Sequence, residues 1–331
     1  MNTILYVLVS SPSDVYLEQA YISMHSLRYY MPNVHIVLLT DNATKRTFTG
    51  IRKDETKYAD EIIAIDLDAD KYNGQQRSRI LKTSARKYVK GDFLYIDCDT
   101  IITKPLPLDD VEVIDADIAA CWDTHSLFKD NPYRDMCIEH ARLLGWNIES
   151  EKEYFNCGVM YVKDSPVAYK FYESWNKNWY EGLEKGVKMD QPSFALTNHQ
   201  MNHVVKVMHD VWNCELKHGI RYLKDAYIVH YLCTNPSVFQ TKQLFLLNEK
   251  DVLMEVKRTG CLSEDINRTI EDPFYGLADI THLFAGEDIY FFQTKSYTYL
   301  RSRFKKGRVS LQEKWLMLFK AIGDIKCKLF G

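Results

Sequence analysis

The sequence predicts an α/β fold, in which a mostly parallel sheet is flanked by helices and followed by a C-terminal helical extension. Residues 4–9 form a continuous apolar run, as expected of a strand buried on both faces of a sheet. A helical pattern over 15–30 and a second apolar run over 34–39 follow, and this β-α-β order implies a parallel pair of strands. A further apolar run over 93–96 leads directly into two acidic residues.

The composition is that of a globular chain. Of its 331 residues, 46% are hydrophobic and 26% are charged, and no apolar run approaches the roughly 18–20 residues that a membrane-spanning helix needs. The run over 4–9 has no basic residue before it and no small-residue cleavage site after it. We therefore interpret it as a core strand and not as a signal peptide.

The cysteines predict a reducing, cytoplasmic environment. They form no C-x-x-C pair and no zinc-like spacing, and several lie in apolar runs, where a free thiol behaves as a small hydrophobic group. The cysteines are Cys98, Cys121, Cys137, Cys157, Cys214, Cys233, Cys261 and Cys327.

The net charge of −3 hides an asymmetry along the chain. From Lys295 to the end there are ten Lys or Arg residues and two Asp or Glu residues, so this tail carries +8 and the rest carries −11. An acidic body argues against nucleic acid as its partner.

The loop after the first strand has the sequence Ser10-Ser11-Pro12-Ser13-Asp14. It matches neither a Walker motif nor G-x-G-x-x-G, so neither an NTPase nor a dinucleotide-binding protein is indicated. Two interpretations remain: Ser10 and Ser11 hold a nucleoside at the carboxyl end of the strand, or the loop caps the following helix.

A third strand is expected over 61–65 and a basic helix over 74–90. Arg79, Lys82 and Arg86 recur at helical spacing, which would bring their charges near a diphosphate. The alternative is a solvated basic face.

Asp97 and Asp99 are the centre of the predicted site. Alternate residues of an extended chain share a face, so the two carboxylates point the same way at roughly 6–7 Å separation. Such a pair is unfavourable unless water or a cation neutralises it, and Mg²⁺ or Mn²⁺ prefers carboxylate and phosphate oxygens. The pattern predicts a metal–phosphate site at the carboxyl end of a buried strand.

Later segments add polar groups at strand ends. A strand is expected over 117–123, a helix over 132–146, and a strand over 154–162 that carries Asn156 and Gly158, suited to sugar hydroxyls and to close backbone approach. Asp190 and Gln191 precede a proline at a helix start, where Asp190 lines a site or caps the helix. His230 ends an apolar run, and we expect it to join the two aspartates as a metal ligand.

These segments together resemble a GT-A (Rossmann-like) glycosyltransferase, most closely glycosyltransferase family 8. The resemblance covers residues 3–235. It rests on residues 95–102 (YIDCDTII), residues 155–160 (FNCGVM), Asp190-Gln191, Trp212-Asn213 and Val229-His230-Tyr231, in this order.

The resemblance implies a nucleotide-sugar donor, commonly a UDP-sugar, and a Mn²⁺ or Mg²⁺ ion. Asp97 and Asp99 would bind metal and diphosphate, with His230 as the third protein ligand. The donor sugar would be lined by Asn156, Asp190 and Gln191, and the helix carrying Arg79 and Lys82 would lie near the donor.

The resemblance also implies transfer with retention of configuration. In one account the leaving phosphate takes the acceptor's proton, and in another a side chain acts as nucleophile, for which Asp190 is the nearest candidate. An inverting enzyme would need a carboxylate base on the acceptor side, which Asp123 would supply. The chain departs from the family after His230, where a glycine and a diphosphate-contacting lysine usually follow but residues 232–236 read LCTNP.

The sequence argues against two other functions. A nucleotidyltransferase that makes sugar nucleotides would usually have a glycine-rich, basic loop after the first strand, and residues 10–13 lack both features. A non-catalytic protein that binds a nucleotide sugar or docks at a membrane would not need the Asp97, Asp99 and His230 set.

The predicted organisation is a catalytic domain over 1–235, a helical acceptor-side addition over 236–294, with its clearest helical run over 243–257, and a basic amphipathic tail over 295–331. In the tail, Leu311, Trp315 and Leu318 begin an apolar stripe at helical spacing, preceded by a basic cluster. The stripe either packs on the enzyme or, through residues 300–331, binds an anionic membrane surface on the inner face. A glycan or lipid-linked acceptor is expected.

Overall fold

The computed structural model describes residues 2–109, 115–232, 246–277, 294 and 296–297. The tail over 300–331, and with it the predicted membrane-binding helix, lies outside the described residues, as does most of 277–294. Among the described residues no helix combines the length and apolar character that crossing a membrane requires.

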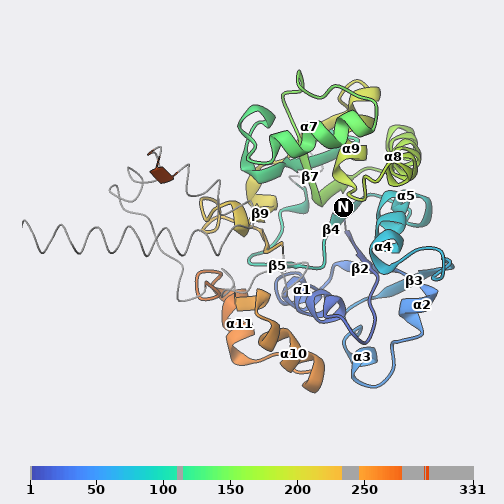
Figure 1. Ribbon diagram of the computed structural model, residues 1–331. Helices are drawn as coiled ribbons and strands as arrows, with labels where there is room; N and C mark the ends of the chain where they lie inside the picture. Colours follow the sequence, from blue (N-terminus) through green and yellow to red (C-terminus); the bar gives the residue numbers. More distant parts are fainter. Residues whose placement is uncertain (1, 110–114, 233–245, 278–293, 295, 298–331) are drawn as a thin grey trace, which may run out of the picture. The chain divides into compact units, whose positions relative to one another are not determined.

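A seven-stranded sheet forms the centre of the fold (Figure 1). Its strands are β1 (Thr3–Leu8), β2 (His35–Asp41), β3 (Glu61–Ile65), β4 (Phe93–Ile96), β6 (Ile118–Trp122), β7 (Phe155–Val162) and β8 (Val205–Val207). They lie in the order β3-β2-β1-β4-β7-β6-β8. The pairs β3–β2, β2–β1, β1–β4 and β6–β8 are parallel, whereas β7 runs antiparallel to both of its neighbours. The mostly parallel α/β sheet predicted from the sequence is confirmed.

Alternate residues of each strand face opposite layers of the core. On β1, Ile4 and Tyr6 pack in one buried cluster, and Leu5 and Val7 pack in the other. Burial of both faces explains why the strand reads as one continuous apolar run.

Helices flank this sheet on both faces, and further helices pack on the outside of these. The helices are α1 (Tyr16–Tyr30), α2 (Asn42–Lys45), α3 (Ile51–Asp54), α4 (Gly74–Thr83), α5 (Ala85–Tyr88), α7 (Arg134–Leu143), α8 (Pro166–Glu184), α9 (Gln191–Gln200), α10 (Lys250–Thr259) and α11 (Glu264–Glu271). Buried residues of α4, α5, α8 and α9 join one cluster, and those of α1 join the other. Figure 1 shows α4, α5 and α8 side by side, away from α1.

The prediction of one helix over 74–90 is wrong in one respect. The segment forms two helices, α4 and α5, which meet at Ser84. The Ser84 hydroxyl donates to the carbonyl of Ile80 at 2.6 Å, and the Thr83 hydroxyl donates to that of Arg79 at 2.8 Å. Such local side-chain hydrogen bonds compete with the regular helix pattern.

A smaller sheet of β5 (Thr100–Ile102), β10 (Ile228–His230) and β9 (Cys214–Glu215) extends the fold beyond β4. β10 pairs antiparallel with β5, which sets His230 opposite Thr100. This pairing brings the end of the apolar run over 226–231 back to the Asp97–Asp99 segment.

Two helices from the C-terminal part pack against α1. Leu253 and Val256 of α10 and Ile266 and Ile270 of α11 share a buried cluster with Ile22 of α1. Within the predicted helical run over 243–257, the α-helix begins only at Lys250, after a short 3-10 turn.

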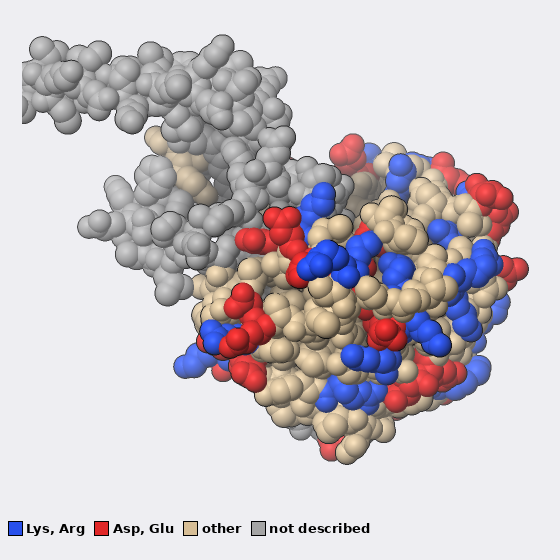
Figure 2. All heavy atoms as spheres, turned by 90° about the horizontal axis from the view of Figure 1, so that it is seen from below, with Lys and Arg blue, Asp and Glu red and all other residues tan. Residues whose placement is uncertain are grey.

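The face seen in Figure 2 carries charges of both signs. Over its described residues, acidic and basic side chains are interspersed, with other residues between them. That part of the surface therefore presents no large area of a single sign.

Candidate active site

A cavity of about 850 Å³ lies at one edge of the seven-stranded sheet, a volume typical of ligand sites. The carboxyl ends of β1, β4 and β6 reach this edge, and so does the amino end of β7 because that strand runs the other way. With the exception of Arg86, the site residues proposed from the sequence line the cavity: Ser10, Ser11, Arg79, Lys82, Asp97, Asp99, Asn156, Gly158, Asp190, Gln191 and His230.

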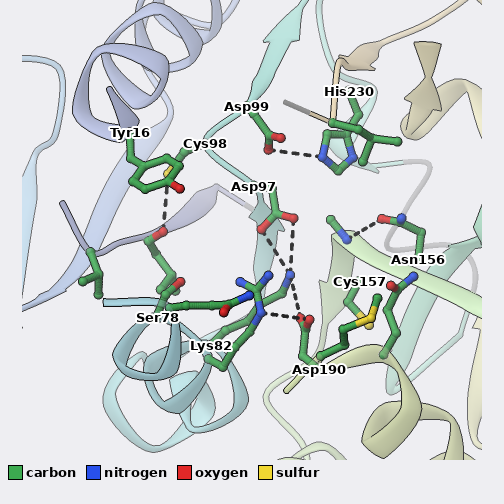
Figure 3. A pocket seen from close by; sticks show the side chains of 18 of the residues that line it. Tyr16, Ser78, Lys82, Asp97, Cys98, Asp99, Asn156, Cys157, Asp190 and His230 are labelled. Atoms are coloured by element: carbon green, nitrogen blue, oxygen red, sulfur yellow. Dashed lines mark hydrogen bonds and ion pairs between the residues drawn. The ribbon is translucent and has the colours of Figure 1, made fainter. Parts of the chain in front are cut away.

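Asp97, Asp99 and His230 converge as a possible metal site. One ligand atom from each lies within 4.8 Å of the other two, and His230 Nε2 is 3.2 Å from Asp99 Oδ1 (Figure 3). Burial alone would raise the pKa of Asp99 and lower that of His230, but their mutual attraction reverses both shifts. Two carboxylates and an imidazole suit a divalent ion.

A chain of amides orients the imidazole of His230. Its Nδ1 lies 2.9 Å from Asn213 Oδ1, and Asn213 Nδ2 donates to Asn156 Oδ1 at 3.0 Å. Asn156 Oδ1 also accepts from the backbone of Gly158 at 2.7 Å. Because Nδ1 faces a carbonyl-type acceptor, Nε2 is left to face Asp99. The oxygen of Asn156, expected from the sequence to read sugar hydroxyls, is thus engaged within the protein.

Gly158 lies against the ring of His230. A Cβ at this position would come within 2.4 Å of His230 Cε1 and 2.7 Å of its Nδ1. The absence of a side chain at residue 158 therefore makes room for the imidazole itself.

We expect Gly158→Ala to displace the His230 ring, because overpacking of this kind costs about 1–3 kcal/mol. The variant should have a lower melting temperature than wild type. It should also bind Mn²⁺ more weakly, as measured by titration calorimetry. Gly74→Ala is the matched control, since its Cβ would meet only Val9 Cγ1 at 3.8 Å. Equal Mn²⁺ affinity in wild type and Gly158→Ala would contradict the proposed role of the ring.

Lys82 is held between two carboxylates. Its Nζ lies 3.1 Å from Asp97 Oδ1 and 3.1 Å from Asp190 Oδ2, and its side chain is only 3% exposed (Figure 3). Arg79 Nε lies 3.0 Å from Asp190 Oδ1, and the hydroxyl of Tyr95 donates to Asp97. The solvated-face interpretation is therefore wrong for Lys82.

The charges of this cluster are tightly coupled. Burial opposes ionisation of Asp190, but Arg79 and Lys82 outweigh it and lower the pKa of the carboxyl to about 2. Burial likewise disfavours the Lys82 cation, yet Asp190 and Asp97 raise its pKa. All three side chains are charged at neutral pH.

Two interpretations of single residues are corrected. The side chain of Asp190 makes no capping hydrogen bond to α9, because it faces the two cations instead. Arg86 does not line the cavity. It is fully buried, pairs with Asp164 at 3.2 Å and lies over the Phe93 ring.

Asp14 holds the serine loop. Its carboxylate accepts from Ser10 Oγ at 2.7 Å, from the Ser11 backbone at 2.7 Å and from Ser11 Oγ at 2.9 Å. Neither serine caps α1, whose N-cap residue is Val15 and makes no side-chain hydrogen bond. Asp14 Oδ1 does accept from the backbone N–H of Tyr16, the first residue of α1, at 3.2 Å. The loop therefore caps the helix through Asp14, and the helix-capping interpretation is confirmed in this respect.

Asp123 directly follows β6 and lines the cavity, where its carboxylate accepts hydrogen bonds from three side-chain amides. Asn131 Nδ2 and Gln191 Nε2 each donate to it at 2.9 Å, and Asn156 Nδ2 donates at 3.4 Å. Both of its oxygens are engaged, and two of these hydrogen bonds link the end of β6 to Asn156 of β7 and to Gln191 of α9.

The sequence did not indicate two further residues of the site: Glu215, which lines the cavity, and Tyr95, which contacts Asp97. Glu215 lines the cavity, is fully buried, and burial raises the pKa of its carboxyl well above the usual value. The segment 214–218 has no apolar periodicity that would have indicated this burial. Tyr95 lies in the strand run itself, where its hydroxyl gave no signal of contact with Asp97.

No family model matches the chain. No curated protein matches it either. Solved structures do match. An active-site mutant of the galactosyltransferase LgtC has a TM-score of 0.52 at 14% identity, covering 80% of this chain and 99% of that one. The glycosyltransferase GlyE of Streptococcus pneumoniae TIGR4 has a TM-score of 0.50 at 15% identity, covering 86% and 66%. Mouse xyloside xylosyltransferase 1 has a TM-score of 0.48 at 16% identity, covering 70% and 97%.

At sequence identities this low, structural similarity shows the fold and not the function. The LgtC and GlyE structures carry the argument, and their likeness agrees with the fold expected from the sequence. The chain has the GT-A fold of glycosyltransferases.

Proposed function

We propose that the protein is a metal-dependent glycosyltransferase that moves a sugar from a nucleotide-diphosphate sugar, most simply a UDP-sugar, to a glycan or lipid-linked acceptor. The observation that carries the proposal is the convergence of Asp97, Asp99 and His230 beside Lys82 and Asp190 in one cavity. A GT-A fold supports it.

The three ligand residues fit a divalent cation. Their ligand atoms lie close enough to share one ion, and the Asn213 contact leaves Nε2 of His230 facing the carboxylates. A bound Mn²⁺ or Mg²⁺ would supply positive charge beside a leaving diphosphate. The protein's own part is to hold these ligands, since orientation before reaction is the main source of electrostatic catalysis.

Arg79 and Lys82 fix Asp190 as an anion beside the proposed donor sugar. With two cations on its oxygens, Asp190 would have to break an ion pair to attack the sugar as a nucleophile. This arrangement favours the account of retention in which the leaving phosphate takes the acceptor's proton and the protein supplies charge and position. Gln191, tied to Asp123 at 2.9 Å, would position the sugar from the acceptor side.

Hydrolysis of nucleotide sugars in the absence of an acceptor tests the proposal. We expect slow release of the nucleoside diphosphate from one of a panel of UDP- and GDP-sugars in Mn²⁺, and none in excess EDTA. Equal release in EDTA would contradict metal dependence, and no release or binding across the panel would contradict the donor class.

A cytoplasmic location at the inner face of a membrane is also proposed. Every cysteine among the described residues is free, which supports a reducing compartment: Cys98, Cys121, Cys137, Cys157, Cys214 and Cys261. Membrane contact would come from the basic tail, at about 1 kcal/mol per Lys or Arg near an anionic leaflet.

For the tail, we expect full-length protein to sediment with anionic vesicles at low salt and to be released by added salt. Removal of residues 300–331 should abolish sedimentation and preserve donor hydrolysis. Full-length protein that stays in the supernatant at low salt would show that the tail serves another purpose.

A further inference from the structure

Three metal-ligating side chains meet outside the cavity, at the end of α9 away from Asp190. Glu151 lies in the loop before β7, His199 in the last turn of α9, and His203 in the turn between α9 and β8. Glu151 Oε1 is 2.8 Å from His199 Nδ1, and Glu151 Oε2 is 3.5 Å from His203 Nδ1. None of the three lines the cavity described above.

The three ligand atoms lie close enough together to share one ion. A tetrahedral zinc ion lies about 2.0–2.1 Å from nitrogen and oxygen ligands, which sets its ligand atoms roughly 3.3–3.4 Å apart. The carboxylate-to-imidazole distances of 2.8 and 3.5 Å bracket this value, and all three ligand atoms lie within 4.8 Å of one another. A simple hydrogen bond from His199 Nδ1–H to Glu151 Oε1 would not need the second imidazole.

The surrounding residues hold both histidines in this arrangement. The centroids of the Trp146 and His199 rings are 5.1 Å apart. The backbone N–H of His203 donates to the carbonyl of Asn198 at 2.8 Å, which folds the turn back over the end of α9. The side-chain oxygen of Asn198 accepts from the backbone of Val205 at 3.0 Å and secures the exit of that turn.

The ligand types distinguish this group from the one at the sheet edge. Two imidazoles and one carboxylate favour Zn²⁺ or a similar transition metal, whereas two carboxylates and one imidazole also suit Mg²⁺ and Mn²⁺. We propose that Glu151, His199 and His203 form a second metal site that takes Zn²⁺, with water in the fourth position.

Such a site would tie together two elements that carry cavity residues. Glu151 precedes β7, which begins with Phe155 and Asn156, and His199 lies in the last turn of the helix that begins at Gln191. A zinc ion here would stabilise the loop before β7 against the end of α9, and it would do so whatever the donor or the reaction.

Zinc titration of metal-free protein tests this proposal. Because Asp97, Asp99 and His230 would also take zinc, the titration is done in Asp99→Asn protein against a chromophoric chelator. We expect one zinc equivalent, with a higher melting temperature on binding. His199→Gln and His203→Gln, each made in that background, should weaken zinc binding at least about 10-fold, since even the outer partners of metal ligands contribute 10- to 100-fold.

His35→Gln is the matched control. Its imidazole is 44% exposed, the same as that of His199, and it also lies near carboxylates, at 3.9 Å from Asp60 and 3.6 Å from Glu61. The His35→Gln substitution should leave zinc affinity unchanged. Binding of Co²⁺ gives a second readout, because a tetrahedral site produces visible absorption bands that should be lost in His199→Gln and kept in His35→Gln.

Two results would overturn the proposal. One is the absence of zinc binding at micromolar concentration in Asp99→Asn protein whose circular dichroism matches wild type. The other is equal zinc affinity in His199→Gln and His35→Gln, which would assign the bound ion to some other group.

Discussion

Asp99→Asn is expected to lower the rate of nucleotide-sugar hydrolysis by about 10²–10³-fold while the protein stays folded. Asparagine keeps the shape of the side chain but removes the charge that faces His230 Nε2 at 3.2 Å. Loss of one preorganised group that stabilises developing charge costs about 2.7–4 kcal/mol in comparable cases. The rate of nucleoside diphosphate release, measured at saturating Mn²⁺, checks this prediction.

Asp92→Asn is its control. Asp92 immediately precedes β4, at the end of the strand opposite to Asp97 and Asp99, and its side chain accepts from the backbone of Asp164 at 2.6 Å. The control should hydrolyse donor at the wild-type rate. An Asp99→Asn enzyme with full activity would contradict a role for Asp99 in the reaction.

The second large effect is expected at Asp190. Asp190→Asn should lower kcat by about 10²-fold or more and change nucleotide affinity much less, because the charge acts beside the sugar and not on the base. The variant also leaves Lys82 with Asp97 as its ion-pair partner and Arg79 without Asp190. We expect a loss of stability of at most about 3–5 kcal/mol, the usual cost of breaking a buried ion pair.

The pH dependence of stability has a defined sign at this residue. The pKa of Asp190 falls from 3.8 to about 2 on folding, so its ion pairs stabilise the protein above the unfolded pKa. That contribution is lost as the pH falls through about 2. The difference in free energy of unfolding between wild type and Asp190→Asn, measured by denaturant unfolding, should therefore stay constant between pH 5 and pH 8.

Asp164→Asn separates stability from catalysis. It removes the partner of Arg86, another buried cation, but neither residue lines the cavity. This control should lose stability and keep kcat. If Asp190→Asn also keeps kcat, Asp190 is a structural residue and its proposed place beside the sugar is wrong.

The strands could be predicted because burial on both faces leaves a plain pattern. The run over 4–9 overlaps β1, and the apolar residues before Asp97 coincide with β4. The direction of β7 could not be predicted in the same way. A strand buried on both faces has the same apolar pattern whether it runs parallel or antiparallel. Only pairing shows that the amino end of β7, with Asn156, shares an edge with Asp97.

The contacts that complete the site are long-range, so local sequence patterns carry no trace of them. Asn156, Asn213 and His230 form one hydrogen-bonded chain although they are far apart in sequence. Helical spacing groups Arg86 with Arg79 and Lys82, yet the helix breaks at Ser84 and Arg86 enters the core. Periodicity gives the direction of a side chain from its own helix, whereas the partner that it meets depends on the whole fold.

The central claim is that a divalent ion and a nucleoside diphosphate share the site of Asp97, Asp99 and His230. Calorimetric titration of UDP and GDP into wild-type protein, in Mn²⁺ and in EDTA, tests it most directly. We predict that Mn²⁺ tightens the binding of one of these nucleotides, that the nucleotide tightens Mn²⁺ binding by the same factor, and that Asp99→Asn abolishes this coupling. Nucleotide affinity that is the same in Mn²⁺ and EDTA, or coupling that persists in Asp99→Asn, would contradict the claim.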